Sequence, residues 1–532
     1  MRHKFWRQGE PYVWATGLAL ALVLFLTLTL LGVVIANGIA IFWPRPLALA
    51  ELTDGGKVLG EIRQREQQPH GKEWRYQFKV ANREMYGLDF RWLDAAAIRQ
   101  LSEPQDALVV ERLENGNFHG FLREIRFPNQ PPQPASDTAS LTKARQAIIP
   151  LLAEVDRLNA SIATLNARLE KIQGQLAKLR FRHEGSDAAR ITALEGQEHT
   201  LKAEFDALAN RLADRRTALN QYEALFVDAS GSEKGIALAE IVRFYQPNTM
   251  TVWQKSGYYL ARLKELFCAE PREANTEGGL FPAIFGTIML VFLMSIFSFP
   301  IGVLAGIYLR EYAKEGILVK MVRIAVNNLA GIPSIVYGIF GLGFFIYGIG
   351  STIDQLFFPE RLPNPTFGTG GILWASLTLA LLTVPVVIVA TEEALGAIPP
   401  GIREGSQALA ATKFQTLTKL LLPMASPGIL TGFILAMARA AGEVAPLMIT
   451  GVVKLAPSLP LDGQFPYLHL DRKFMHLGFH IYDIGFQSPN VEAAKPMVYV
   501  TTLLLILIVL VMTSTAIYLR NQMRKRYSVV DV

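Results

Sequence analysis

The sequence predicts an α-helical integral membrane protein with six transmembrane helices and a large outer α+β insert. The chain of 532 residues is 51% hydrophobic and has a mean hydropathy of +0.25, which is apolar for a soluble protein. Five stretches without a formal charge are each long enough to cross a bilayer. A sixth is interrupted only by Arg439 and Glu443. One long polar stretch separates the first of the six from the others.

The predicted membrane spans are bounded by charged residues. Five of them lie between Glu10 and Arg45, Glu277 and Arg310, Arg323 and Asp354, Arg361 and Glu392, and Lys495 and Arg520, and the interrupted one covers about 427–452. The first is too long for the hydrophobic region of a cleaved signal peptide. We therefore expect it to remain as an uncleaved anchor in the lipid bilayer.

The short loops differ in their content of Lys and Arg. Loops that would share a side with the N-terminus carry far more of these residues than the other short loops, which places both termini in the cytoplasm. This asymmetry accounts for the net charge of +6, so we expect no nucleic-acid partner. The only cysteine, Cys268, falls on the outer side and can form no disulfide within the chain.

The spans divide the chain into three regions. Residues 1–43 hold the cytoplasmic N-terminus and the first transmembrane helix, 44–280 the outer insert, and 281–532 five further helices. Residues at about 44–134 and 232–247 alternate apolar and polar side chains, which predicts a β-rich module. Within the module, Glu114 to Asn117 read ENGN, which is typical of a hairpin turn, and a Pro-rich linker follows it.

The rest of the insert has helical periodicity. Residues at about 148–225 carry two heptad patterns, which a short Gly-Ser break separates. This arrangement favours an antiparallel coiled-coil hairpin over parallel dimerisation. Residues at about 249–268 predict an amphipathic helix, with Trp253, Tyr258 and Tyr259 suited to the lipid headgroup layer. A buried helix of the outer module is the alternative for this last segment.

A charged, Ala-rich loop at 392–425 separates the fourth and fifth spans. Pro399 and Pro400 end the preceding helix and allow a new one to begin. Thr412 and Gln415 have the spacing of a capping box, which predicts a second short helix. Phe414 stands beside small alanines as an aromatic anchor. The pattern predicts a helix-turn-helix that inserts into a pocket of a partner.

This loop resembles the "EAA" coupling loop of ABC-importer permeases. That pattern runs Glu-Ala-Ala, three residues, Gly, nine residues, then Ile-x-Leu-Pro; here Gly405-Ser406 replaces the alanines and Ala410 replaces the glycine. The resemblance implies docking to a cytoplasmic ATPase. An amphipathic connector on the membrane surface is the alternative. The residues assigned to ATPase coupling are Glu404, Gly405, Ser406, Leu409, Ala410, Phe414 and Pro423.

Arg439 and Glu443 are the most informative charges in the predicted spans. They lie four residues apart, on one helix face, and Arg439 falls about 18 Å along the helix from Pro427, near the middle of the bilayer. One interpretation is a self-neutralising pair that joins helices. The other is an anion path, because a guanidinium matches a phosphate-type oxyanion with its planar fork.

The third span and the last outer loop supply further candidates. Ser334 and Gly338 have the spacing of close helix packing. Ser334 and Asn328 can also donate hydrogen bonds to an anion, and we assign both to the transport path. His469, His476 and His480 cluster in the outer loop, but a His pair without further ligands is more often structural, so no metal site is assigned.

The chain lacks the motifs of an enzyme. No GxxxxGK[ST] segment occurs, so it carries no ATP-binding P-loop of its own, and no nucleophile–base signature is present. We therefore expect neither catalytic residues nor a cofactor bound by this chain.

Four segments together resemble the permeases of phosphate-specific ABC transporters: EANTEGGLFPAIFGT, NNLAGIPSIVYGIFGLGFF, the coupling loop and GFILAMARAAGEVAPLMITG. The resemblance covers about half of the chain. It implies the fold of ABC-importer permeases, a sister permease, an ATPase dimer that hydrolyses ATP, a periplasmic phosphate-binding protein and a location in the bacterial inner membrane. Two alternatives stay open: a permease for molybdate or sulfate, and a membrane-anchored scaffold or sensor that uses the coiled coil.

Overall fold

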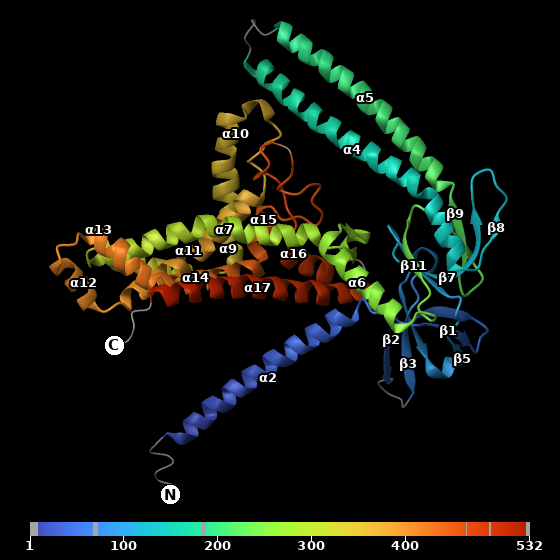
Figure 1. Ribbon diagram of the computed structural model, residues 1–532, viewed down its shortest axis with the longest axis horizontal. Helices are drawn as coiled ribbons and strands as arrows, with labels where there is room; N and C mark the ends of the chain where they lie inside the picture. Colours follow the sequence, from blue (N-terminus) through green and yellow to red (C-terminus); the bar gives the residue numbers. More distant parts are fainter. Residues whose placement is uncertain (1–8, 68–72, 183–187, 464, 489–490, 528–532) are drawn as a thin grey trace.

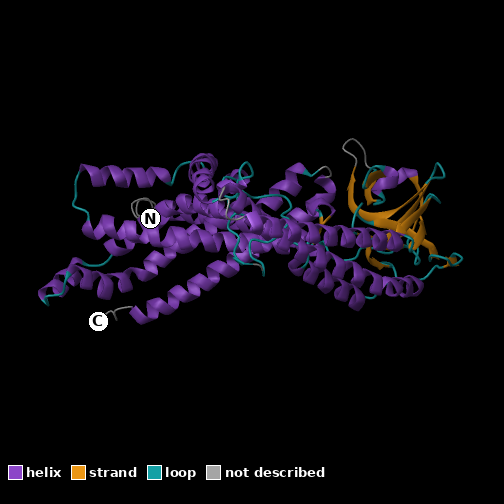
Figure 2. Ribbon diagram, turned by 90° about the horizontal axis from the view of Figure 1, so that it is seen from above, coloured by secondary structure: helices purple, strands orange, loops and turns teal. Residues whose placement is uncertain are grey.

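The computed structural model describes residues 9–67, 73–182, 188–463, 465–488 and 491–527. Long helices form one end of the molecule, and the strands gather at the other end (Figures 1 and 2). The start of α2, the end of α17 and the short helices of the coupling loop lie at the end away from the strands (Figure 1). The predicted cytoplasmic segment at 1–8 lies outside the described residues.

Six helices among the described residues are long and apolar enough to cross a membrane, as predicted. The first, α2, lies along the last, α17, and exposes most of its apolar side chains. α7, α14 and the third span pack against α11, which is buried along most of its length, and α17 packs on α14. The spans are α2 (Glu10–Ala40), α7 (Phe281–Ile307), α9 to α10 (Ser334–Phe357), α11 (Ile372–Gly396), α14 (Leu422–Gly442) and α17 (Val491–Tyr527).

The third span begins later than the uncharged stretch predicted. An amphipathic helix, α8 (Ile317–Leu329), comes first and is followed by a turn. Pro333 then precedes α9 (Ser334–Phe340), which continues through a π-helical segment (Gly341–Gly350) into α10 (Ser351–Phe357). Proline disfavours helix for the residue before it and lacks an N–H, so the chain breaks where the sequence suggested only a bend.

Two antiparallel sheets form the outer module. One has the strand order β4-β3-β2-β1-β5, and the other β10-β9-β7-β6-β11, with β8 paired to β7. The strands of the first sheet are β1 (Leu47–Leu52), β2 (Lys57–Gln67), β3 (Trp74–Lys79), β4 (Phe90–Asp94) and β5 (Ile98–Ser102). Those of the second are β6 (Leu108–Arg112), β7 (Phe118–Arg126), β8 (Gln133–Pro134), β9 (Glu223–Val227), β10 (Glu233–Ala237) and β11 (Ile241–Tyr245).

The outer module contains more strands than the alternation of apolar and polar residues in the sequence indicated. Three strands follow the helical hairpin where one was expected, and β8 lies in the segment interpreted as a linker. The predicted turn between β6 and β7 is present, with a positive φ of 67° at both Asn115 and Gly116, as a type I′ hairpin requires. Small elements complete the chain: α3 (Arg83–Tyr86), β12 (Pro271–Arg272), β13 (Glu277–Gly278), α15 (Ala445–Thr450) and α16 (Leu477–Tyr482).

The two heptad segments form α4 (Thr138–Arg182) and α5 (Ala188–Asn220), which lie side by side (Figure 1). Their direction is antiparallel, because Glu154 pairs with Arg211 at 2.9 Å and Arg180 with Glu195 at 2.7 Å. Knobs-into-holes packing of the seam stays a prediction. Near its tip, the hairpin reaches the end of the third span, where Lys178 lies 3.9 Å from Glu360.

The amphipathic helix α6 (Val252–Cys268) leads from the outer module into α7. Trp253 is 87% exposed, which fits the predicted headgroup position. Tyr258 does not fit that position, because its ring packs against Tyr245 and its hydroxyl donates a hydrogen bond to Glu111. Tyr259 contacts Phe42 and Trp43 at the end of the first span. One face of α6 therefore belongs to the outer module.

Candidate functional site: the coupling loop and the charged pair

Two short helices form the predicted coupling loop. α12 (Pro400–Ala408) follows α11, and α13 (Lys413–Thr416) continues through a π-helical turn (Leu417–Leu421) into α14. Their inner side packs on a cluster that includes Leu395, Ile398, Leu417 and Leu421. The loop is therefore fixed to the ends of α11 and α14.

Arg403 fastens α12 to two transmembrane helices. Its Nη2 donates to Glu311 Oε1 and to Leu395 O, each at 2.7 Å, and its Nη1 donates to Ile398 O at 2.9 Å. Leu395 lies in the last turn of α11, and Ile398 follows that helix by two residues. Glu311 follows α7. A displacement of α12 must therefore act on α7 and α11 together.

The turn between α12 and α13 has the geometry of a Schellman motif. Ala411 N donates to Ser406 O at 3.2 Å and Ala410 N donates to Gln407 O at 2.9 Å, as this motif requires. Ala410 has a φ of 59°, a conformation that glycine adopts without strain. The family's glycine position is thus conformationally required, and this chain fills it with alanine.

The start of α13 is fixed by the predicted capping box. Thr412 Oγ1 accepts from Gln415 N at 3.2 Å, and Thr412 N donates to Gln415 Oε1 at 2.9 Å. Ser406 and Thr416 join the two helices through a hydroxyl–hydroxyl hydrogen bond of 2.8 Å, and both are buried. Ser406 is thus an internal brace of the loop and not part of its exposed surface, and its assignment to ATPase coupling stays a prediction.

The loop exposes an apolar surface to its outside. Phe414 is 66% exposed and Leu409 is 85% exposed. Glu404, Gly405 and Ala410 are exposed too, whereas Pro423 is half-buried in the first turn of α14. Of the seven residues assigned to ATPase coupling, five therefore form the outer surface of the loop.

Arg439 and Glu443 form an ion pair at the end of α14. Arg439 Nε lies 3.6 Å from Glu443 Oε1, and their side chains are 39% and 19% exposed. The helix ends at Gly442, and Glu443 is its C-cap in extended conformation. The two residues therefore do not share one continuous helix, contrary to the prediction, although the pair itself forms. Pro446 at the start of α15 explains the break, because it cannot donate to the preceding turn.

The remaining path candidates do not all gather at this pair. Ser334 is the first residue of α9, half-buried, while Asn328 lies exposed on α8 before the span begins. Asn328 therefore lies outside the third span, contrary to its predicted place in it, and its role in transport stays a prediction. Gly338 packs so close to α15 that a Cβ there would lie 2.8 Å from Pro446 Cα, which confirms close helix packing.

The three histidines of the outer loop have separate surroundings. His469 Nε2 lies 3.0 Å from Asp462 Oδ1, whereas His476 Nδ1 accepts from Gly478 N at 3.1 Å and caps α16. His480 is buried. No group of three or more ligand-type side chains suited to a metal ion occurs in the part of the chain that the structure describes.

Sequence reasoning missed two parts of the loop. Glu311 lies 92 residues before Arg403, and no local pattern connects them. Thr416, the partner of Ser406, follows the recognised capping box but belongs to no motif. An acidic residue directly after a span and an arginine inside the loop were the only available signals.

Comparison with known proteins places this geometry in a family. Residues 298–525, from α7 to α17, match the model "Binding-protein-dependent transport system inner membrane component". A probable phosphate transport system permease protein PstA of Methanocaldococcus jannaschii is 34% identical over 41% of this chain and 67% of its own. The phosphate transport system permease protein PstA of Yersinia pestis is also 34% identical, over 44% of this chain and 70% of its own.

Among solved structures, the MetNI methionine ABC transporter in an inward-facing conformation covers 46% of this chain and 95% of that chain, with 20% identity and a TM-score of 0.35. That score is too low to support an argument, so the family assignment rests on the sequence matches. The family match begins within α7, and the large outer insert precedes the matched region. The chain therefore belongs to the family of binding-protein-dependent transport system inner membrane components, among its phosphate transport permeases.

Proposed function

We propose that this chain is the permease subunit of an ATP-driven importer of inorganic phosphate, and that α12 and α13 dock into a separate ATPase. The observation that carries the docking is the exposed pair Phe414 and Leu409 on a loop that is otherwise packed and capped. A large aromatic side chain left in solvent beside a rigid turn is suited to a pocket on a partner. ATP hydrolysis then resides on that partner, and this chain supplies no catalytic group.

The clamp at Arg403 explains how docking acts on the membrane. Because Arg403 binds the end of α11 and Glu311 after α7, a movement of the ATPase pocket shifts both helices with the loop. α11 packs along α7 and α14, so the core responds as one body. We infer that this movement alternates the access of the transport path, which a sister permease completes.

Arg439 is the residue proposed to receive the anion. Its side chain is more than a third exposed although it lies in an apolar helix, and its ion pair with Glu443 is long, at 3.6 Å. A phosphate oxyanion can replace Glu443 on the guanidinium through two parallel hydrogen bonds. Glu443 then keeps the arginine in place between transport cycles, and Ser334 is the proposed neutral donor.

The orientation follows from the two ends of the molecule. The end of α17 and the coupling loop share one end, and the outer module occupies the other (Figure 1). We place the first end in the cytoplasm, because it holds Arg403, Lys413, Arg524 and Lys525. The chain then resides in a bacterial inner membrane with its insert in the periplasm, where a phosphate-binding protein delivers the substrate.

Phe414→Asp tests the docking. A carboxylate in an apolar pocket is costly when unpaired, so we expect the ATPase to be lost from the purified complex while the permease still inserts. Phe486→Asp is the matched control, since Phe486 is also exposed, at 79%, outside the coupling loop. Full retention of the ATPase by Phe414→Asp would contradict the proposal.

A further inference from the structure

A basic pocket lies where the outer module meets the membrane helices. Its volume is about 400 Å³, and three parts of the chain enclose it: the last turn of α2, the strands β2 to β4 and the first turns of α17. Four cationic side chains line it, those of Arg45, Arg63, Lys79 and Lys495, and Glu492 is the one carboxylate among the described lining residues.

These cations are incompletely neutralised. Arg45 Nη1 donates only to the carbonyls of Ile62 and Arg63, at 3.4 and 3.3 Å. Across the described ranges, no carboxylate oxygen lies within 4.0 Å of the charged nitrogens of Arg45, Lys79 or Lys495. Arg63 Nη2 pairs with Glu61 at 2.7 Å, yet its Nε is buried with no hydrogen-bond partner in that part of the chain.

The local electrostatics favour an added anion. Burial, followed by the positive charge of Arg63, lowers the pKa of Arg45 below its ordinary value. Glu61 is ionised, because Arg63, Lys79 and other cations outweigh its burial and lower its pKa, but it already serves Arg63. Gln77 ties the wall to α17 by donating to Glu492 at 3.3 Å, which engages the remaining carboxylate.

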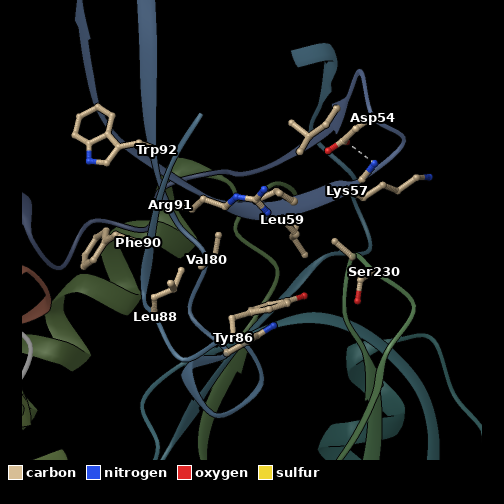
Figure 3. Close-up of a pocket in the computed structure, with 15 residues that line it drawn as sticks. Asp54, Lys57, Leu59, Val80, Tyr86, Leu88, Phe90, Arg91, Trp92 and Ser230 are labelled. Carbon is tan, nitrogen blue, oxygen red and sulfur yellow. Dashed lines mark hydrogen bonds between the residues drawn. The ribbon is translucent and has the colours of Figure 1, made fainter. Parts of the chain in front are cut away.

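Successive side chains of β4 point in opposite directions, and this strand lies between the basic pocket and a second cavity of the module. In Figure 3, Arg91 points toward Leu59 and the second cavity, of about 700 Å³, while Phe90 and Trp92 point away from it. Phe90 and Trp92 line the basic pocket as well. Asp54, Lys57 and Arg91 all line the second cavity, so its charges are mixed, whereas the pocket beside the membrane is mainly cationic.

The lining residues place the basic pocket at the border of the membrane. Asn37 and Ala40 of its lining lie in the last turn of the first span, and Tyr499 lies in the sixth. An apolar cavity of about 480 Å³, lined by Ile39, Ala40, Trp43, Arg45 and Tyr259, shares Ala40 and Arg45 with it. A cationic pocket that adjoins an apolar one at the end of a transmembrane helix suits a phosphate group with attached hydrocarbon.

We propose that the pocket formed by Arg45, Arg63, Lys79 and Lys495 binds a phosphate group, carried by an anionic phospholipid of the outer leaflet or free as inorganic phosphate. The adjoining apolar cavity favours the phospholipid. Such a ligand would hold the outer module against α2 and α17, which otherwise meet it through few polar contacts such as the bond from Gln77.

The test uses the full transporter complex in nanodiscs. Wild type, Arg45→Gln and Lys495→Gln are placed in phosphatidylcholine discs, with or without phosphatidylglycerol, and retained phosphatidylglycerol is counted by native mass spectrometry. A lysine or arginine near a membrane surface contributes about fivefold in affinity for an anionic lipid, so each variant should lose about that factor. Arg99→Gln is the control, as an exposed arginine of β5 away from the pocket.

A second arm measures binding of radiolabelled inorganic phosphate in discs of phosphatidylcholine alone. Loss of phosphatidylglycerol retention in both pocket variants, but not in Arg99→Gln, supports the lipid. If both pocket variants instead lose phosphate binding, and Arg99→Gln does not, the result supports free inorganic phosphate as the ligand. Unchanged binding of both ligands in Arg45→Gln and Lys495→Gln, with complexes of normal yield and thermal stability, overturns the proposal.

Discussion

Arg403→Gln should separate ATP hydrolysis from transport. The arginine is 21% exposed and Glu311 10%, so the hydrogen bonds are little screened by water. A hydrogen bond to a charged group contributes about 1.5–3 kcal/mol, and two carbonyls and one carboxylate share this guanidinium. We therefore expect the attachment of α12 to weaken by about 3 kcal/mol, which corresponds to about a hundredfold in its local opening equilibrium.

The docking surface does not include Arg403, so the ATPase should remain bound to this variant. In proteoliposomes, the ratio of phosphate taken up to ATP hydrolysed should fall severalfold. Lys419→Gln, which changes an exposed cation of the same loop, should keep the wild-type ratio. An unchanged ratio in Arg403→Gln, with the ATPase bound, would refute the idea that this clamp transmits movement.

Two further predictions concern stability. Ala410→Gly should leave the loop as stable or stabilise it by up to about 1 kcal/mol, because it relieves the left-handed conformation at φ 59°, and Ala410→Val should destabilise it; hydrogen exchange of α12 and α13 measures both. Burial lowers the pKa of His119 in β7 to about 4, so the unfolded chain binds the proton more readily. The neutral His119 therefore contributes about 3 kcal/mol of stability, which is complete above pH 6.5 and is lost as the pH falls toward 4. Hydrogen exchange of β7 in the full chain should show this dependence of stability on pH, and His119→Phe should abolish it.

The parts of the fold that local chemistry dictates could be predicted from the sequence. Six apolar stretches gave six spans, because the bilayer requires long uncharged helices. The Thr412–Gln415 capping box and the turn at Asn115-Gly116 formed as expected, since both depend on residues within a few positions. The antiparallel direction of α4 and α5 followed from the short break between them.

Tertiary contacts decided the features that the sequence did not reveal. Asn328 was assigned to a span because no charge separates it from Ser334, yet Pro333 starts a new helix between them. Ser406 has helical spacing with Leu409, but its side chain is buried and its hydroxyl forms a hydrogen bond with Thr416. Glu443 has the spacing of a helical pair with Arg439, whereas α14 ends one residue before it. The errors at Asn328 and Glu443 arose where one helix was assumed to continue.

Uptake of radiolabelled phosphate by Arg439 variants, measured with the yield of assembled complex, tests the central claim most directly. Arg439→Lys keeps the charge but loses the planar fork, so uptake should be impaired. Arg439→Gln removes a charged hydrogen-bond donor and should lower uptake by about tenfold or more, with the complex still assembled. Glu443→Gln should be milder, because the arginine remains. Wild-type uptake by assembled Arg439→Gln would show that the pair only joins helices, and would contradict the proposed anion path.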